Sequence, residues 1–153
     1  MLRQGRYSPA QQRAFTELMP RFGLAFRPEA LDFAQVFGRE APVVAEVGFG
    51  MGETTARIAA ENPGTDYLAI EVHAPGVGSL LKQLDEAGLE NVRIVPHDAV
   101  EVLRDMVPPD SLAVPRTVSI VVATLVGSVF ATWLASRQTR IRPRRQPSQH
   151  RGQ

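Results

Sequence analysis

Short apolar runs that alternate with segments of helical length constrain the fold of this chain most strongly. Between residues 43 and 106, three mainly apolar runs of four or five residues are followed by Gly48, Glu71 and Pro96. Such runs are typical of buried parallel strands, and helical connections between them favour right-handed crossovers. The pattern predicts an α/β fold with a parallel sheet and helices on its faces.

Local signals set the boundaries of the expected elements. A first helix begins at Pro9 and is expected to end near Met19, because Pro20 follows it. A second helical segment begins at Pro28 and stops at Gly38. The expected helices are 9–19, 28–38, 52–61, 76–87 and 98–106, the last with Val100, Leu103 and Met106 on its apolar face, and the expected strands are 43–47, 67–71 and 92–95.

The sequence Glu-Val-Gly-Phe-Gly-Met-Gly at residues 46–52 joins the first predicted strand to the following helix. A doubly wound sheet places its ligand at this point, and glycine lets the backbone turn sharply and come close to it. Gly48, Gly50 and Gly52 are therefore candidate cofactor-binding residues. For the motif taken alone, a tight turn without a ligand is the alternative.

Three carboxylates flank this loop in the predicted sheet. Glu46 lies inside the first strand, Glu71 closes the second, and Asp98 follows the third. Glu71 is placed to accept hydrogen bonds from ribose hydroxyls, and Asp98 lies near the place of an adenine ring. Glu46 requires a positive partner to offset its desolvation, and the amino group or sulfonium of a cofactor would supply one. Acids here would repel a pyrophosphate, which favours S-adenosylmethionine over NAD.

Two of these acids also have structural interpretations that involve no ligand. Glu71 could be a solvated strand end, and Asp98 could cap the helix that follows it. Cysteine is absent and the three histidines are scattered, so no pattern of metal ligands is present and no metal is expected.

Four motifs occur in a specific order along the first 103 residues. They are Arg-Gln-Gly-Arg at residues 3–6 with Ser8 and Gln11, then residues 46–52, then Ile-Glu-Val-His-Ala-Pro-Gly-Val-Gly at 70–78, then His-Asp-Ala-Val-Glu-Val-Leu at 97–103. In order and spacing they resemble the bacterial tRNA (guanine-N7-)-methyltransferase family. The resemblance implies a Rossmann-like class I methyltransferase fold with about three of the family's strands. It also implies that Glu46, Glu71 and Asp98 contact S-adenosylmethionine. Because it begins at Arg3, we expect a leader typical of the family to be missing.

The next motif of that family is absent. The resemblance implies a strand ending in Phe-Pro-Asp-Pro-Trp and a basic run, beginning near residue 118, but no Asp follows Asp110 and no Lys follows Lys82. No catalytic residue can therefore be assigned, and we expect this chain to be inactive. His73 and His97 could act as general bases, but methyl transfer to a ring nitrogen requires alignment more than proton removal.

Charge divides the chain near residue 112. Residues 1–110 carry all 16 acidic groups against ten basic ones, whereas residues 111–153 carry seven arginines and no acid. We expect a partial S-adenosylmethionine-binding domain at 1–112 and an atypical tail at 113–153. The tail has an uncharged run, 117–136, before its Arg-rich end. A frameshift or misplaced gene boundary is the favoured interpretation, and a membrane anchor, a substitute strand at 118–123 and a basic arm are the alternatives.

The resemblance implies an S-adenosylmethionine-dependent methyltransferase related to enzymes that methylate guanine N7 in tRNA, with tRNA as its partner. A small-molecule methyltransferase is one alternative. A non-catalytic binding module, membrane-tethered or basic-tailed, is another. The lack of cysteine and of a basic leader followed by an apolar run predicts a cytoplasmic location. Oligomeric state and the choice of tRNA are open at this point.

Overall fold

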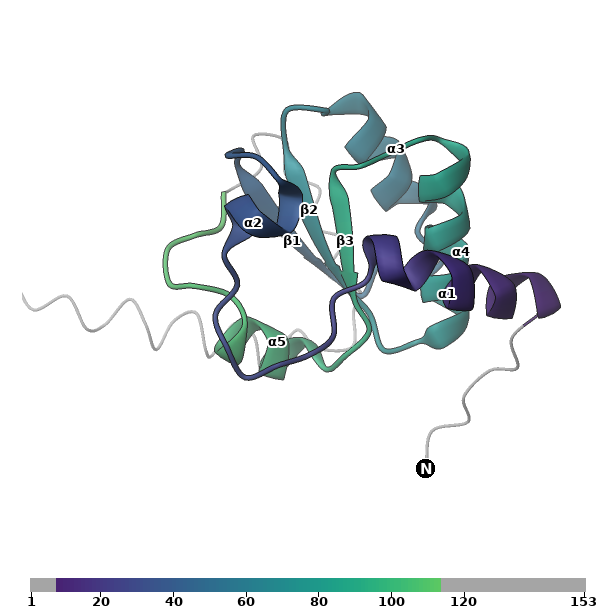
Figure 1. Cartoon of the computed structure of the whole chain (residues 1–153), viewed down its shortest axis with the longest axis horizontal. Coiled ribbons are helices and arrows are strands. Elements are labelled where there is room, and N and C mark those ends of the chain that lie inside the picture. Colours follow the sequence, from purple (N-terminus) through teal and green to yellow (C-terminus); the bar gives the residue numbers. More distant parts are fainter. Residues whose placement is uncertain (1–7, 114–153) are drawn as a thin grey trace, which may run out of the picture. The chain divides into compact units, whose positions relative to one another are not determined.

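The computed structural model describes residues 8–113. They form a three-stranded parallel sheet in the order β1-β2-β3, with helices on both faces (Figure 1). The predicted α/β fold with a parallel sheet is confirmed. In chain order the elements are α1 (Pro9–Phe22), α2 (Phe33–Phe37), β1 (Val43–Val47), α3 (Glu53–Glu61), β2 (Asp66–Ile70), α4 (Ala74–Glu86), β3 (Val92–Val95) and α5 (Ala99–Asp105).

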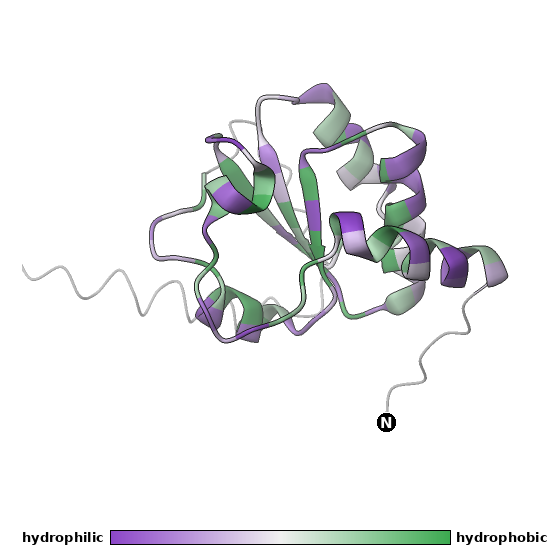
Figure 2. Ribbon diagram, viewed as in Figure 1, coloured by the Kyte–Doolittle hydropathy of each residue, from purple (hydrophilic) through white to green (hydrophobic). Residues whose placement is uncertain are grey.

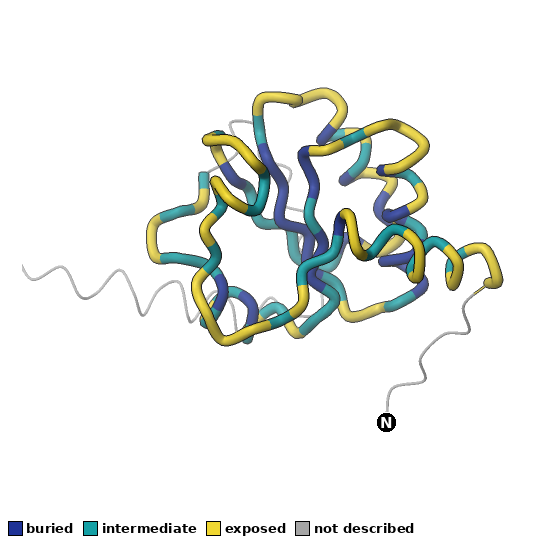
Figure 3. Tube along the Cα trace, viewed as in Figure 1, coloured by how far each residue is buried: buried dark blue, intermediate teal, exposed yellow. Residues whose placement is uncertain are grey.

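The sheet separates two apolar layers, and β2 contributes to both. Tyr67 and Ala69 belong to the layer under α1, α3 and α4, whereas Leu68 and Ile70 belong to the layer under α2 and α5. All five residues of β2 are buried, as the dark tube at the centre of Figure 3 shows. Covering on both faces explains why this strand is a nearly continuous apolar run rather than an alternating one; in Figure 2 it is green beyond its hydrophilic start.

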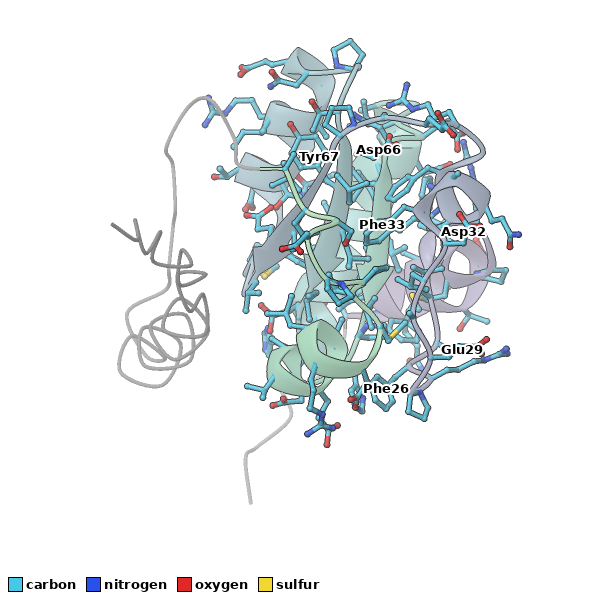
Figure 4. All side chains as sticks on the ribbon, turned by 90° about the vertical axis from the view of Figure 1, so that its left-hand side faces the viewer. Phe26, Glu29, Asp32, Phe33, Asp66 and Tyr67 are labelled. Carbon is cyan, nitrogen blue, oxygen red and sulfur yellow. The ribbon has the colours of Figure 1, made fainter. Side chains whose placement is uncertain are left out.

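The one charged residue of β2 is held by an ion pair. Asp66 is 1% exposed at the start of the strand, where Figure 4 labels it beside Tyr67. The Arg39 guanidinium donates to its carboxylate, with Nη2 2.6 Å from Oδ1, and also to the carbonyl oxygen of Pro63. Burying a carboxylate without such a partner is costly, so Arg39 fixes the loop before β1 to the start of β2.

The two edges of the sheet are covered to different extents. Along β3, Gly23 bridges Ile94, and the Leu24 N–H donates to the Ile94 carbonyl at 2.8 Å. Along the outer edge of β1, Leu112 bridges Val43 in the parallel sense. The Ala113 N–H also donates to the Val43 carbonyl at 2.7 Å, so the contacts that residues 8–113 make along this edge lie at the first residue of β1.

The first helix is longer than predicted. α1 continues through Pro20 and ends at Phe22, whereas an end near Met19 was expected. Phe22 is fully buried, and the Arg21 guanidinium forms ion pairs with Asp85 and Glu90. These tertiary contacts hold the last turn in helical form although Pro20 cannot donate a backbone hydrogen bond.

The second helix is shorter than predicted. α2 begins at Phe33 rather than Pro28, because the Leu31 N–H donates to the Met106 carbonyl at 2.8 Å and Asp32 caps the helix after it. A backbone bond to a distant element thus holds the preceding residues outside the helix.

The apolar face of the last helix was assigned partly wrongly. Val100 is 53% exposed, whereas Val102 is fully buried and Met106 is 1% exposed. Leu103 packs against the same cluster, as predicted. α4 also begins two residues earlier than expected, at Ala74, and β2 runs one residue earlier, from Asp66.

Several sequence-based expectations lie outside the described residues. They concern the Arg-Gln-Gly-Arg motif at 3–6, the uncharged run at 117–136, the substitute strand at 118–123 and the Arg-rich end. Within residues 8–113, no helix is long and apolar enough to cross a membrane.

Candidate cofactor-binding site

The loop from Gly48 to Gly52, called the Gly-rich loop below, joins β1 to α3. All three of its glycines have left-handed backbone, with φ of 73° at Gly48, 61° at Gly50 and 86° at Gly52. Other residues rarely adopt this conformation, so the turn depends on glycine at each position. The Gly48 N–H donates to the Ile70 carbonyl at 2.8 Å, which holds the loop beside the end of β2.

Helix α4 comes so close to the Gly-rich loop that side chains are excluded. A Cβ added at Gly76 would lie 2.0 Å from the carbonyl oxygen of Gly50, and one added at Gly52 would lie 2.7 Å from Cβ of Leu80. Sequence reasoning gave Gly76 no role. The only signal for it was its place in the 70–78 motif.

Glu71 lies directly after β2 and binds the Gly-rich loop. Its Oε2 accepts a hydrogen bond from the Gly50 N–H at 3.1 Å, and its Oε1 accepts from the N–H groups of Val72 and His73 at 2.8 and 2.9 Å. A merely solvated strand end would make no such bonds. Because a carboxylate oxygen has about two acceptor sites, Oε1 is already filled by its two bonds, whereas Oε2 keeps capacity for a hydroxyl donor of a ligand.

Asp98 follows β3 and caps α5, as its structural interpretation predicted. Its Oδ1 accepts hydrogen bonds from the N–H groups of Val100 at 2.9 Å and Glu101 at 3.2 Å. Oδ2 makes no hydrogen bond to another residue of the described range. The cap therefore orients the carboxylate while one oxygen stays available.

Glu46 is partly buried in β1, close to the Gly-rich loop. Burial raises the pKa of its carboxyl group above the usual value of 4.5, and the nearby Thr55 hydroxyl acts in the opposite direction with the smaller effect. No Lys, Arg or His of residues 8–113 forms a salt bridge with it. A cationic group arriving from outside would therefore stabilise the ionised form.

Exposed apolar side chains accompany the acids. Met51, Val72 and Val100 are 41, 64 and 53% exposed, and each follows the carboxyl end of a different strand. Ligand sites for flat organic rings combine apolar walls with a few placed polar groups. The carboxyl edge of this sheet offers both. Among residues 8–113, no group of three or more His, Asp or Glu side chains is placed to hold a metal ion.

Residues 40–116 match the sequence profile of a family described as "Putative methyltransferase". The matched span contains every strand of the sheet, the Gly-rich loop and all three strand-end acids. The chain belongs to this methyltransferase family.

Known relatives of this chain agree with the resemblance stated from the four motifs. This chain is 60% identical over 113 residues to the "tRNA (guanine-N(7)-)-methyltransferase" of Aromatoleum aromaticum. The match covers 74% of this chain and 44% of the relative. A protein of the same description from Paraburkholderia xenovorans is 58% identical over 110 residues, a match that covers 72% of this chain and 42% of the relative. A solved structure titled "Structure of an antibiotic related Methyltransferase" is 21% identical in sequence and matches with a TM-score of 0.40. The match covers 48% of this chain and 41% of that structure's chain. The chain spans less than half the length of the two curated relatives.

The raised pKa of Glu46 predicts how the stability of the folded chain depends on pH. Because the folded state holds the Glu46 proton more tightly than the unfolded state, the associated stability is full below the unfolded pKa, near 4.5, and is lost as pH rises through the folded pKa. Because Gln does not titrate, we expect the stability of the Glu46→Gln variant not to fall with rising pH in this way. Thermal melts of both proteins across acidic to neutral pH should therefore diverge, and parallel curves would contradict the assignment.

Proposed function

We propose that residues 8–113 bind S-adenosylmethionine at the carboxyl edge of the sheet, and that they form the cofactor half of a methyltransferase of the tRNA (guanine-N7-) type. The observation that carries the proposal is the bond from the Gly50 N–H to Glu71. It unites the Gly-rich loop and the strand-end acid in one site. An acid-lined site of this kind suits a cationic cofactor without phosphate groups.

Each acid has a proposed role toward one part of the cofactor. Glu46, which lacks a cationic partner among the described residues, would face the amino group or the sulfonium. Glu71 would accept hydrogen bonds from the ribose hydroxyls, and Asp98 would accept one from the adenine amine through Oδ2. Gly48, Gly50 and Gly52 would let the backbone approach the cofactor. Met51, Val72 and Val100 would supply apolar surface.

The cofactor would supply an electrophilic methyl group, and the protein would supply orientation and electrostatics. Glu46 lies within β1, Glu71 follows β2 and Asp98 follows β3, so together they would hold the cofactor in one orientation with its charge neutralised. No described residue is proposed as a catalytic acid or base. The His97 ring is stacked against Phe26, and the backbone N–H of His73 donates to Glu71; neither contact assigns a proton-transfer role to these histidines.

tRNA as the substrate is proposed from the relatives, which are described as tRNA (guanine-N(7)-)-methyltransferases. The described residues themselves do not suit a phosphate backbone. Residues 8–113 carry all 16 acidic groups of the chain against eight basic ones, and nucleic-acid binding requires a basic surface. Contacts to tRNA would therefore come from outside this range. We propose that the chain of residues 1–153, which lacks the motif expected near residue 118, does not methylate tRNA.

The experiment for the cofactor site is calorimetric titration of the 153-residue chain with S-adenosylmethionine. Glu71→Ala should weaken binding by roughly 1.5–3 kcal/mol, the usual worth of hydrogen bonds to a charged group. Glu71→Gln, which keeps one acceptor oxygen, should weaken it less. Glu86→Ala serves as the matched control, because Glu86 is exposed on α4, where it pairs with Lys82. Equal affinity in the wild type and Glu71→Ala would refute the role of Glu71.

A further inference from the structure

A stacked pair of rings lies next to Asp98 and belongs to no part of the site described so far. The rings of Phe26 and His97 are 4.0 Å apart between centroids and nearly parallel, at 13°. Phe26 belongs to the segment between α1 and α2, and Figure 4 labels it beside α5. Backbone hydrogen bonds hold this segment at both ends, from Leu24 to Ile94 and from Leu31 to Met106.

The same histidine is bound from a second side. His97 Nε2 lies 2.5 Å from Oε2 of Glu101, one turn along α5. The Glu101 N–H in turn donates to Oδ1 of Asp98. The His97 N–H donates to the Val95 carbonyl at 2.9 Å, which shapes the turn directly after β3. His97 and Asp98 thus both contact Glu101, and Phe26, from a different part of the chain, stacks on the His97 ring.

This arrangement acts on the orientation of one carboxylate. Asp98 is exposed at a loop, where side chains are ordinarily mobile. Its cap bonds fix Oδ1 to the start of α5, and the His97–Glu101 contact and the Phe26 stack fix that start relative to β3. Oδ2 then has a defined direction. A fixed acceptor can distinguish a ring that carries an amine from one that carries a carbonyl at the same position.

We propose that Phe26 and His97 are positioning residues that make the site selective for adenine over hypoxanthine, acting through Asp98. The inference rests on the proposed cofactor site and adds a specificity to it. Neither ring contacts the cofactor in this account. Loss of the Phe26–His97 stack would leave the cofactor affinity contributed by Glu46 and Glu71 largely intact. The preference for the amine-bearing base would be lost.

The test compares two ligands, S-adenosylhomocysteine and its deaminated form S-inosylhomocysteine, titrated against the 153-residue chain. We expect the wild type to prefer the adenosyl ligand by at least about tenfold, because the carbonyl of hypoxanthine would face the Asp98 carboxylate. Phe26→Leu, His97→Leu and Asp98→Ala should each bring this ratio close to one. Phe26→Tyr, which retains the stack, should keep it.

Glu71→Ala is the control for a general loss of the site. It should weaken both ligands equally and leave the ratio unchanged. A His97→Leu or Phe26→Leu protein that melts near the wild-type temperature and keeps the full ratio would overturn the proposal. A wild type that binds both ligands equally would overturn it too, while leaving the cofactor site standing. A wild type that binds neither would overturn the proposed function and this inference together.

Discussion

Gly76→Ala should reduce the affinity for S-adenosylmethionine by about 100-fold, close to 2.7 kcal/mol. A Cβ at this position would lie 2.0 Å from the carbonyl oxygen of Gly50 and 3.1 Å from its carbonyl carbon. Backbone cannot yield as the end of a flexible side chain can, so the Gly-rich loop would have to move. That movement would stretch the hydrogen bond from the Gly50 N–H to Glu71. The substitution would thus disturb the loop and an acid together.

The matched control is Gly64→Ala. Gly64 lies in the turn between α3 and β2, and an added Cβ there would meet no atom within 4 Å. Its affinity for the cofactor should equal that of the wild type, and its stability should be unchanged or slightly raised. Overpacking by Gly76→Ala should also cost about 1–3 kcal/mol of stability, so melting curves must accompany the titration. A folded Gly76→Ala protein with wild-type affinity would show that the close approach of Gly76 to Gly50 is not needed for cofactor binding.

Purified residues 1–153 should transfer no methyl group to tRNA above background, even where they bind the cofactor. The Phe-Pro-Asp-Pro-Trp motif that the family resemblance places near residue 118, with its Asp and the basic run after it, is absent from this sequence. The described residues carry twice as many acidic as basic groups and would repel a phosphate backbone. Both the alignment of guanine and the binding of its tRNA would therefore be lost.

The assay measures 7-methylguanosine in bulk tRNA by mass spectrometry after incubation with cofactor. The Aromatoleum aromaticum tRNA (guanine-N(7)-)-methyltransferase serves as the positive control. A Glu71→Ala version of this chain guards against a contaminating enzyme. Formation of 7-methylguanosine that depends on the wild-type chain and disappears in this variant would refute the proposed inactivity.

Features that depend on neighbouring residues could be predicted from the sequence. The Gly-rich loop was recognisable because an apolar run, three glycines and a helix follow one another directly, and the structure has left-handed backbone at all three glycines. The cap at Asp98 is also local, since its partners lie two and three residues away. Strands β1 and β3 were bounded correctly for the same reason.

Features that depend on distant contacts could not be predicted. Residues 28–32 have a helical pattern, yet the bond from Leu31 to Met106 holds them outside α2. Gly76 is important because it lies close to Gly50, 26 positions earlier. The residues next to Gly76 in the sequence give no sign of this contact. Phe26 has no periodic pattern around it, and only the fold brings it against His97. The link between Glu71 and Gly50 likewise appears only once β1 and β2 are paired.

An NMR titration of the isotopically labelled 153-residue chain with S-adenosylmethionine would show where the cofactor binds. We predict that the largest amide shift changes occur at the three strand ends, in the Gly-rich loop, at Val72 and His73, and at Val100 and Glu101. These amides either line the proposed site or bond to its acids. Amides at the opposite edge, around Asp66 and Gly64, should stay unchanged. A spectrum unaltered at high cofactor concentration, or changes confined to residues away from the three strand ends, would contradict the account.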